Sequence, residues 1–198
     1  MNKENIIQES IKTLTEIVEA LYSKPSLLLE ELPSNNTALI IVDMINGFAK
    51  EGALQSPRVK DIIPSIVSLS VKCVHSNIQK LAFADAHTDA SPEFESYPPH
   101  CVVGSSESEI VDEIKDVGGY RLIPKNSTNG FLEEAFQNWL EDNAHIDHFI
   151  VVGDCTDICI QQFAVTLKTW FNKANKKSRI IVPINALKLM ILNYTMVI

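Results

Sequence analysis

Short, continuously apolar segments, separated by stretches with helical periodicity, constrain the fold of this chain more than any other feature. Residues 37–42 read Thr-Ala-Leu-Ile-Ile-Val, and residues 179–183 form a similar run. Such runs, without alternation of polar residues, are typical of strands buried on both faces of a parallel sheet. We predict further strands at 80–84, 120–124 and 149–152.

The segments between these strands are predicted to be helices, at 56–77, 106–114, 131–141 and 156–175. Alternating strands and helices predict an α/β fold with three layers, α/β/α, in which helices cover both faces of a mainly parallel, Rossmann-like sheet. Since the 198 residues contain no visible repeat or linker, we expect a single domain over 1–198.

An additional helix is predicted at 3–23, outside the alternating pattern. Its apolar residues recur at helical spacing, and Pro25 would end it. We therefore treat residues 1–30 as an N-terminal helical extension. This helix is expected either to pack across the main domain or to pair with a second copy, and a homo-oligomer is predicted.

Charge and cysteine content limit the partners and the compartment. The formal net charge is −8, which disfavours nucleic acid as a partner because nucleic-acid binding needs clustered Lys and Arg. The apolar run at 37–42 is too short to span a bilayer, so a membrane is not an expected partner either. Four cysteines without a secretory signal suit a reducing compartment, and a cytoplasmic location is expected.

Residues able to perform chemistry follow directly after the predicted strands. Asp43 follows the first strand, Asp85 and His87 the second and Lys125 the third, and Cys159 lies shortly after the fourth. Because the carboxyl ends of parallel strands meet at one edge of the sheet, a carboxylate, an ammonium and a thiol are expected to converge there.

Cys159 is the candidate nucleophile. A helix N-terminus and a neighbouring lysine both favour the thiolate form. Asp43 would take the thiol proton and later activate water, while Lys125 would hold the pair together electrostatically. The alternative interpretation is that Cys159 is a small apolar residue that packs its helix on the sheet.

Cys155 is the competing cysteine. It lies in the turn itself, where its backbone N–H, together with that of Cys159, is better placed to form an oxyanion hole. A Cys155–Cys159 disulfide or zinc pair is a further alternative, although no second closely spaced cysteine pair accompanies it.

The long loop at 85–104 carries the candidate metal ligands Asp85, His87, Glu93 and His100. Asp-x-His at a strand end presents two ligands on one extended segment, and a later histidine can fold back to complete the set. Imidazoles and carboxylates suit Zn, Mn or Fe(II), and three protein ligands leave positions open for water or substrate. The alternative is that these are ordinary solvated loop residues.

Three segments, in this order, resemble the signature segments of the isochorismatase-like cysteine hydrolases. They are Ala-Leu-Ile-Ile-Val-Asp-Met-Ile-Asn-Gly-Phe ending at Phe48, Pro-Lys-Asn-Ser around Lys125, and Val-Val-Gly-Asp-Cys-Thr-Asp-Ile-Cys ending at Cys159. The resemblance runs from about residue 37 to residue 184 and implies an isochorismatase-like fold.

Within that superfamily, Asp85-Ala-His87 and the segment 93–101 resemble the metal site of nicotinamidases. The resemblance implies that Asp85, His87 and His100 bind a divalent transition metal, with Glu93 binding directly or through water. It also implies a cis peptide bond before Cys155. The other implied roles are a catalytic triad of Asp43, Lys125 and Cys159, an oxyanion hole from the amides of Cys155 and Cys159, and aromatic walls from Phe48 and Tyr97.

The activity implied is metal-assisted deamidation of nicotinamide, or a similar pyridine carboxamide, to the acid and ammonia through a thioester. One alternative is a hydrolase of another small amide that keeps the metal site. A second alternative is a catalytically idle, oligomeric binding protein with the same fold.

The tail at 186–198 departs from the resemblance, because it has one charged residue, Lys188, and is otherwise nearly all apolar or amide. It is either a segment covered by the protein or a partner, or the product of a frameshift. In a shifted frame, degenerate codons for this tail can encode Val-Glu-Thr-Tyr-Asp and then Leu-His-Asn-Gly-Asp, a polar stretch of the kind the family would place there. We therefore hypothesise a frameshift near Ala186.

Overall fold

The computed structural model describes residues 2–23 and 26–186. The chain divides into two compact units, Met1–Glu31 and Leu32–Ile198, and each is described by itself. That the whole chain acts as one hydrolase domain with a helical extension stays a prediction. The atypical tail at 186–198 is described only at Ala186, which is buried. The frameshift hypothesis concerns mainly residues 187–198, which lie outside the described residues.

In the first unit, the helix predicted at 3–23 is present as α1, Lys3–Tyr22. The side-chain oxygen of Asn2 accepts a hydrogen bond from the backbone N–H of Glu4 at 3.1 Å and caps the helix. All residues of α1 are described, and none of them is buried. Among the described residues of its own unit, nothing covers the apolar stripe of this helix.

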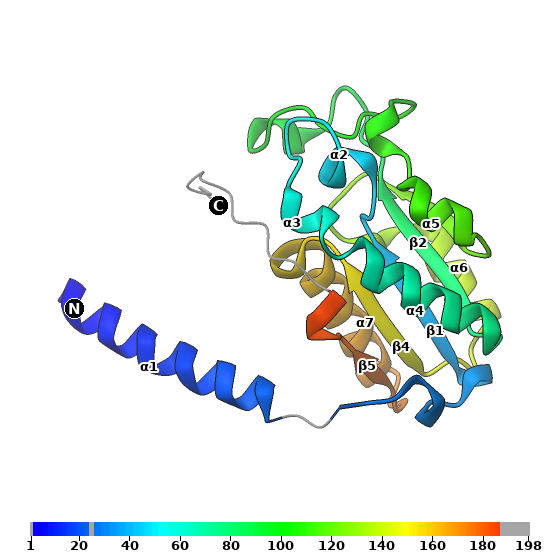
Figure 1. Ribbon diagram of the computed structural model, residues 1–198, viewed down its shortest axis with the longest axis horizontal. Helices are drawn as coiled ribbons and strands as arrows, with labels where there is room; N and C mark the ends of the chain where they lie inside the picture. Colours follow the sequence, from blue (N-terminus) through cyan, green and yellow to red (C-terminus); the bar gives the residue numbers. More distant parts are fainter. Residues whose placement is uncertain (1, 24–25, 187–198) are drawn as a thin grey trace. The chain divides into compact units, whose positions relative to one another are not determined.

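The second unit is built around a five-stranded sheet with the order β3-β2-β1-β4-β5 (Figure 1). The neighbouring strands are parallel, which confirms the prediction for the described part of the chain. The register pairs Val42 at the end of β1 with Phe83 on one side and Gly153 on the other, so the carboxyl ends of the strands meet at one edge. The strands are β1 Thr37–Val42, β2 Gln79–Asp85, β3 Arg121–Lys125, β4 His148–Gly153 and β5 Arg179–Ile181.

Helices cover both faces of this sheet, as the three-layer prediction requires (Figure 1). On one face, α6 (Glu134–Asp142) and α7 (Gln161–Lys173) form the main core with alternate strand residues such as Ile40 and Phe83. On the other face, α4 (Ile63–His75) contacts β1 and β2, and α5 packs beside α4. Helix α5 spans Asp112–Val117.

The single helix predicted at 56–77 is wrong, because the chain forms two helices there. Helix α3 spans Pro57–Lys60, and α4 begins only at Ile63. Pro64 has no N–H, so a continuous helix would leave the carbonyl of Lys60 without its usual partner. The break before α4 removes that conflict.

Three other predicted helices begin later than expected. The segment 106–114 forms a short 3-10 turn and then an extended stretch, because Ile110 pairs with Ile45 in an antiparallel bridge before α5 starts. Helix α6 is preceded by a 3-10 turn, Gly130–Leu132, and α7 by a π-helical turn, Thr156–Ile160. Among the described residues, no helix combines the length and apolarity needed to cross a bilayer.

Candidate active site

The carboxyl edge of the sheet brings together the side chains that the sequence placed at its strand ends. Asp43 directly follows β1 with a positive φ of 54°, and its N–H donates to the carbonyl of Phe83 at 3.0 Å. Asp85 and Lys125 are the last residues of β2 and β3 and pair with each other in the sheet register. Cys159 lies in the π-helical turn after β4. All four residues are buried.

Lys125 lies between the other members of the predicted triad. Its Nζ lies 2.9 Å from Oδ2 of Asp43 and 3.8 Å from Sγ of Cys159. It also contacts Oδ1 of Asp85 and donates to the carbonyl of Ser127 at 3.2 Å. The ammonium thus connects two carboxylates and a thiol.

The surroundings of Cys159 favour its thiolate. A hydrogen bond with Cys155 lowers the pKa of the Cys159 thiol to about 7, assisted by the charge of Lys125 and a hydrogen bond with Asp43, while burial and Asp85 oppose the shift. The opposite holds for Cys155, because its hydrogen bond with Cys159, burial and Asp154 raise its pKa well above the usual value. Of the two cysteines, Cys159 is therefore the one suited to be a nucleophile at neutral pH.

Asp43 is suited to exchange protons. Burial and the neighbouring Asp85 carboxylate raise its pKa well above the usual value, although Lys125 acts in the other direction. Burial alone would lower the pKa of Lys125, but the two carboxylates raise it well above its usual value. The arrangement therefore keeps Lys125 charged beside a carboxyl group with increased proton affinity.

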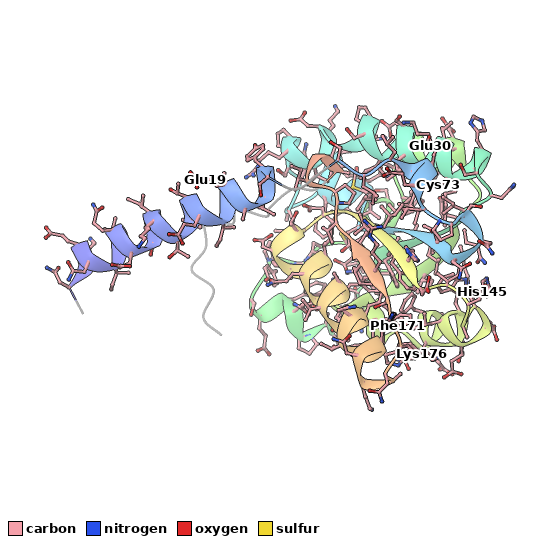
Figure 2. The ribbon with its side chains drawn as sticks, turned by 90° about the horizontal axis from the view of Figure 1, so that it is seen from below. Glu19, Glu30, Cys73, His145, Phe171 and Lys176 are labelled. Atoms are coloured by element: carbon pink, nitrogen blue, oxygen red, sulfur yellow. The ribbon has the colours of Figure 1, made fainter. Side chains whose placement is uncertain are left out.

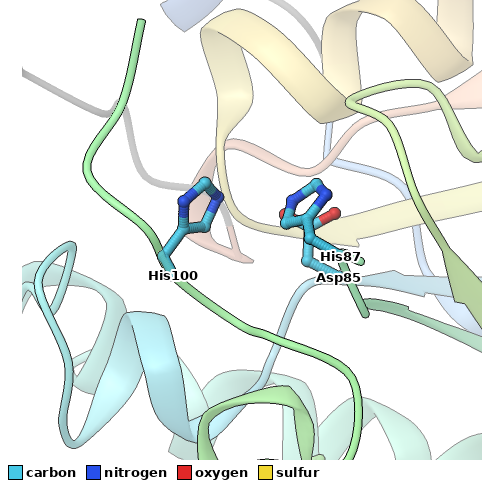
Figure 3. Close-up of side chains that lie close together, drawn as sticks. All are labelled: Asp85, His87 and His100. Atoms are coloured by element: carbon cyan, nitrogen blue, oxygen red, sulfur yellow. The ribbon is translucent and has the colours of Figure 1, made fainter. Parts of the chain in front are cut away.

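Asp85, His87 and His100 form a compact group next to the triad (Figure 3). One potential ligand atom from each residue lies within 4.8 Å of the others, and all three residues are buried. Nε2 of His87 lies 3.6 Å from Oδ2 of Asp85 and is buried without a hydrogen-bond partner among the residues that the structure describes. A buried polar atom without a partner is costly, which indicates a missing ligand at this position.

The hydrogen bonds of the two imidazoles agree with a metal site. Nδ1 of His100 lies 2.9 Å from the carbonyl of Pro98, and Nδ1 of His87 lies 3.3 Å from Oδ1 of Asn126. Each Nδ1 therefore carries the proton toward an oxygen, which leaves the lone pair on Nε2. Burial lowers the pKa of His100, which favours the neutral form that binds metals. The residues present fit a divalent transition metal.

Glu93, Phe48 and Tyr97 complete the pocket. Glu93 lies with Oε2 3.8 Å from Nε2 of His87, while its Oε1 accepts from the N–H of Thr128 at 3.1 Å. The rings of Phe48 and Tyr97 lie 5.8 Å and 6.1 Å from the ring of His100. The pocket is lined by Phe48, Leu54, Asp85, Glu93, Tyr97, His100, Thr128, Cys155, Ile158 and Cys159.

The cis peptide bond expected before Cys155 is present, between Asp154 and Cys155. The thiol of Cys155 donates to Oδ2 of Asp154 at 3.1 Å, and all four cysteines of the chain are free, so the alternative of a Cys155–Cys159 disulfide is not realised.

Sequence reasoning missed Asn126 and Thr128. Asn126 directly follows Lys125 at the same strand end, and this position was the available signal.

The class of protein is defined by a parallel sheet covered on both faces, with a cysteine, a lysine and two aspartates at its carboxyl edge. The chain belongs to the isochorismatase domain family, which matches residues 37–169.

Individual relatives refine this assignment. The chain is 32% identical over 148 residues to Nicotinamidase 1 of Arabidopsis thaliana, a match that covers 67% of this chain and 60% of that protein. The chain thus spans less than two thirds of the length of this curated relative. The crystal structure of N-carbamoylsarcosine amidase from Thermoplasma acidophilum is similar with a TM-score of 0.70 and 26% identity, covering 80% of this chain and 87% of that one. The crystal structure of a nicotinamidase from Bacillus subtilis is similar with a TM-score of 0.66 and 27% identity, and the match covers 78% of this chain and 87% of that one.

Proposed function

We propose that the protein is a metal-assisted cysteine amidohydrolase that converts nicotinamide, or a similar pyridine carboxamide, to the acid and ammonia. The observation that carries this proposal is that Cys159 lines the same pocket as Asp85 and His100, two members of the Asp85, His87 and His100 group. The similarity to nicotinamidases from Arabidopsis thaliana and Bacillus subtilis supports the substrate class.

In the first half of the reaction, Asp43 takes the proton of the Cys159 thiol, and the thiolate attacks the carboxamide carbon. The C–N bond then breaks, Asp43 returns the proton to the departing ammonia, and a thioester remains on Cys159. Lys125 stays protonated throughout and stabilises the Asp43 carboxylate and the Cys159 thiolate. The backbone amides of Cys155 and Cys159 are proposed to donate to the oxyanion.

In the second half, Asp43 takes a proton from water, which attacks the thioester carbon and breaks the C–S bond. The carboxylic acid leaves, and the thiolate of Cys159 is restored. One carboxyl group thus serves as base and acid in turn, a use that agrees with its raised pKa.

Asp85, His87 and His100 would hold the metal, with Glu93 beside them. When bound, a divalent Zn, Mn or Fe ion supplies a Lewis acid for the ring nitrogen of the substrate. Phe48 and Tyr97 would pack against the pyridine ring and orient the carboxamide toward Cys159.

A hydrolase of another small amide is the second candidate function. The similarity to an N-carbamoylsarcosine amidase, at a TM-score of 0.70, favours it. A catalytically idle binding protein with the same fold is the third candidate, and ammonia release separates it from both enzymes.

The test is ammonia release from nicotinamide by the purified chain, after chelation and after reloading with Zn²⁺, Mn²⁺ or Fe²⁺. Benzamide, which keeps the carboxamide but lacks the ring nitrogen, is the matched substrate, and Cys159→Ala gives the background. We expect metal-dependent turnover of nicotinamide and much slower turnover of benzamide. Equal turnover of the two amides would exclude recognition of the ring nitrogen, and no ammonia with any metal would exclude the proposed reaction.

We also propose that the protein is cytoplasmic and forms a homo-oligomer. Its four cysteines are all free and buried, which suits a reducing compartment.

A further inference from the structure

Helix α1 carries an apolar stripe that its own unit leaves uncovered. The large apolar side chains of this helix are between 42% and 77% exposed. They are Ile6, Ile7, Ile11, Leu14, Ile17, Val18, Leu21 and Tyr22. An amphipathic helix of this kind gains most of its stability by burying such a stripe against a partner. Figure 2 shows the side chains of α1 projecting around the helix, with Glu19 labelled.

The stripe follows a seven-residue repeat. Ile7, Leu14 and Leu21 recur every seven residues, and Ile11 and Val18 recur between them with the same period. The spacing along the stripe alternates between four and three residues, which is the a and d pattern of a coiled coil. The same spacing of three and four residues is also found on helices that pack against a globular domain, so the period alone does not distinguish the two partners. The residue types and the charges at these positions favour a second helix.

The residue types at these positions indicate how many helices pair. The β-branched residues Ile11 and Val18 occupy the a positions, and Leu14 and Leu21 occupy d positions after Ile7. In a parallel coiled coil, β-branched residues at a with leucine at d favour two helices over three or four.

Over residues 7–22 the charges are segregated from this seam, while Glu4 at the preceding a position and Lys3 at the preceding g position lie outside it. Between residues 7 and 22, the charged residues Glu9, Lys12, Glu16 and Glu19 all lie at the outer b and f positions. The flanking e and g positions hold only uncharged residues, with Ile17 widening the seam at g. Two copies can therefore pair through residues 7–22 without bringing like charges together.

We propose that α1 is a self-association element that pairs with α1 of a second copy as a parallel, two-stranded coiled coil, about 22 Å long over residues 7–21. The seam consists of the residues at a and d, Ile7, Ile11, Leu14, Val18 and Leu21. This interface is short, so the monomer–dimer equilibrium depends on protein concentration. The pairing is independent of the proposed amidase activity, because no residue of α1 belongs to the candidate active site.

The experiment measures the mass of the full chain by light scattering and sedimentation over a range of concentrations. The wild type is expected to reach the dimer mass. Leu14→Asp places a charge at a d position and is expected to give a monomer. Thr13→Asp introduces the same charge at the neighbouring c position and is the matched control, expected to remain dimeric. Far-UV circular dichroism and ammonia release report separately on the fold and on the activity.

The direction of pairing is tested by disulfide formation. Ile11→Cys places a thiol at an a position, where the two copies of a parallel coil face each other, and is expected to crosslink rapidly on oxidation. Lys12→Cys, at an outer position, is expected to crosslink slowly. A monomeric wild type, as expected if α1 docks on its own chain, would overturn the proposal. So would a dimeric Leu14→Asp variant, a larger assembly, or equal crosslinking of the two cysteine variants.

Discussion

Asp85 and Lys125 form a direct ion pair that connects the candidate metal ligands to the candidate triad. One oxygen of the Asp85 carboxylate contacts Nζ of Lys125, and the other lies 3.6 Å from Nε2 of His87. The Asp85 carboxylate that would bind the metal therefore also contributes to the electrostatic environment of the candidate nucleophile, Cys159.

Cys159→Ala is expected to reduce kcat by ~10³-fold or more, because it removes the atom that forms the thioester. The fold and the metal content should remain, since the change deletes one small buried group. Cys155→Ala is the matched control and should retain most of the activity at high pH, because its backbone N–H is kept. Equal losses in the two variants, measured by ammonia release, would contradict the assignment of the nucleophile.

The reactivity of Cys159 toward iodoacetamide is expected to rise with pH around a midpoint of about 7. The thiolate is the reactive form, so the rate follows its deprotonation. Cys155→Ala should move the midpoint upward, because the hydrogen bond with Cys155 is the largest influence that lowers the pKa of Cys159. An unchanged midpoint would show that this hydrogen bond has no effect on the nucleophile. The measurement needs no turnover and stands apart from the identity of the substrate.

Asn126→Ala is expected to weaken metal binding by about 10–100-fold, because outer partners orient the ligating histidines. Oδ1 of Asn126 lies 3.3 Å from Nδ1 of His87 and also accepts from the N–H of Thr88. Asn126→Asp retains an acceptor oxygen at this place and should bind metal more tightly than the alanine variant. Titration of the chelated protein with Zn²⁺ measures both affinities, and equal affinities would contradict the orienting role.

Asp154→Asn is expected to stabilise the fold at pH 8 relative to the wild type. Burial raises the pKa of Asp154 to about 7, so the folded protein holds a proton that the unfolded chain releases near pH 4. The free energy of unfolding of the wild type therefore falls between about pH 4 and pH 7, by on the order of a few kcal/mol for this group. The variant lacks this decrease.

Urea unfolding at pH 4.5 and pH 8 tests this difference, with Asp142→Asn as the control because Asp142 is exposed at the end of α6. A constant gap between the Asp154 variant and the wild type at the two pH values would contradict the buried-carboxyl explanation.

The fold and the gathering of Asp43, Asp85, Lys125 and Cys159 were predictable, because buried parallel strands place the residues that follow them at one edge. The helix break before Pro64 was predictable in principle from the missing N–H. The extended stretch at Ile110 was not, because its partner Ile45 is distant in the sequence.

The tuning of Cys159 by Cys155 was also beyond sequence reasoning. Both cysteines were candidates, but their relative proton affinities depend on the contacts that burial creates around them. In the same way, the shared use of Asp85 follows from the register of β2 and β3, which places Asp85 opposite Lys125.

The strand order also has a consequence for synthesis on the ribosome. β1 is the central strand and emerges first, yet its two neighbours in the sheet are β2 and the much later β4. Asp43, which follows β1, can form its ion pair only after Lys125 of β3 has been synthesised. A nascent chain that ends before β3 would have to bury an unpaired carboxylate, which is strongly unfavourable. Folding of the catalytic unit is therefore expected to be a late event in translation, and incomplete chains should remain sensitive to proteases until β4 has emerged.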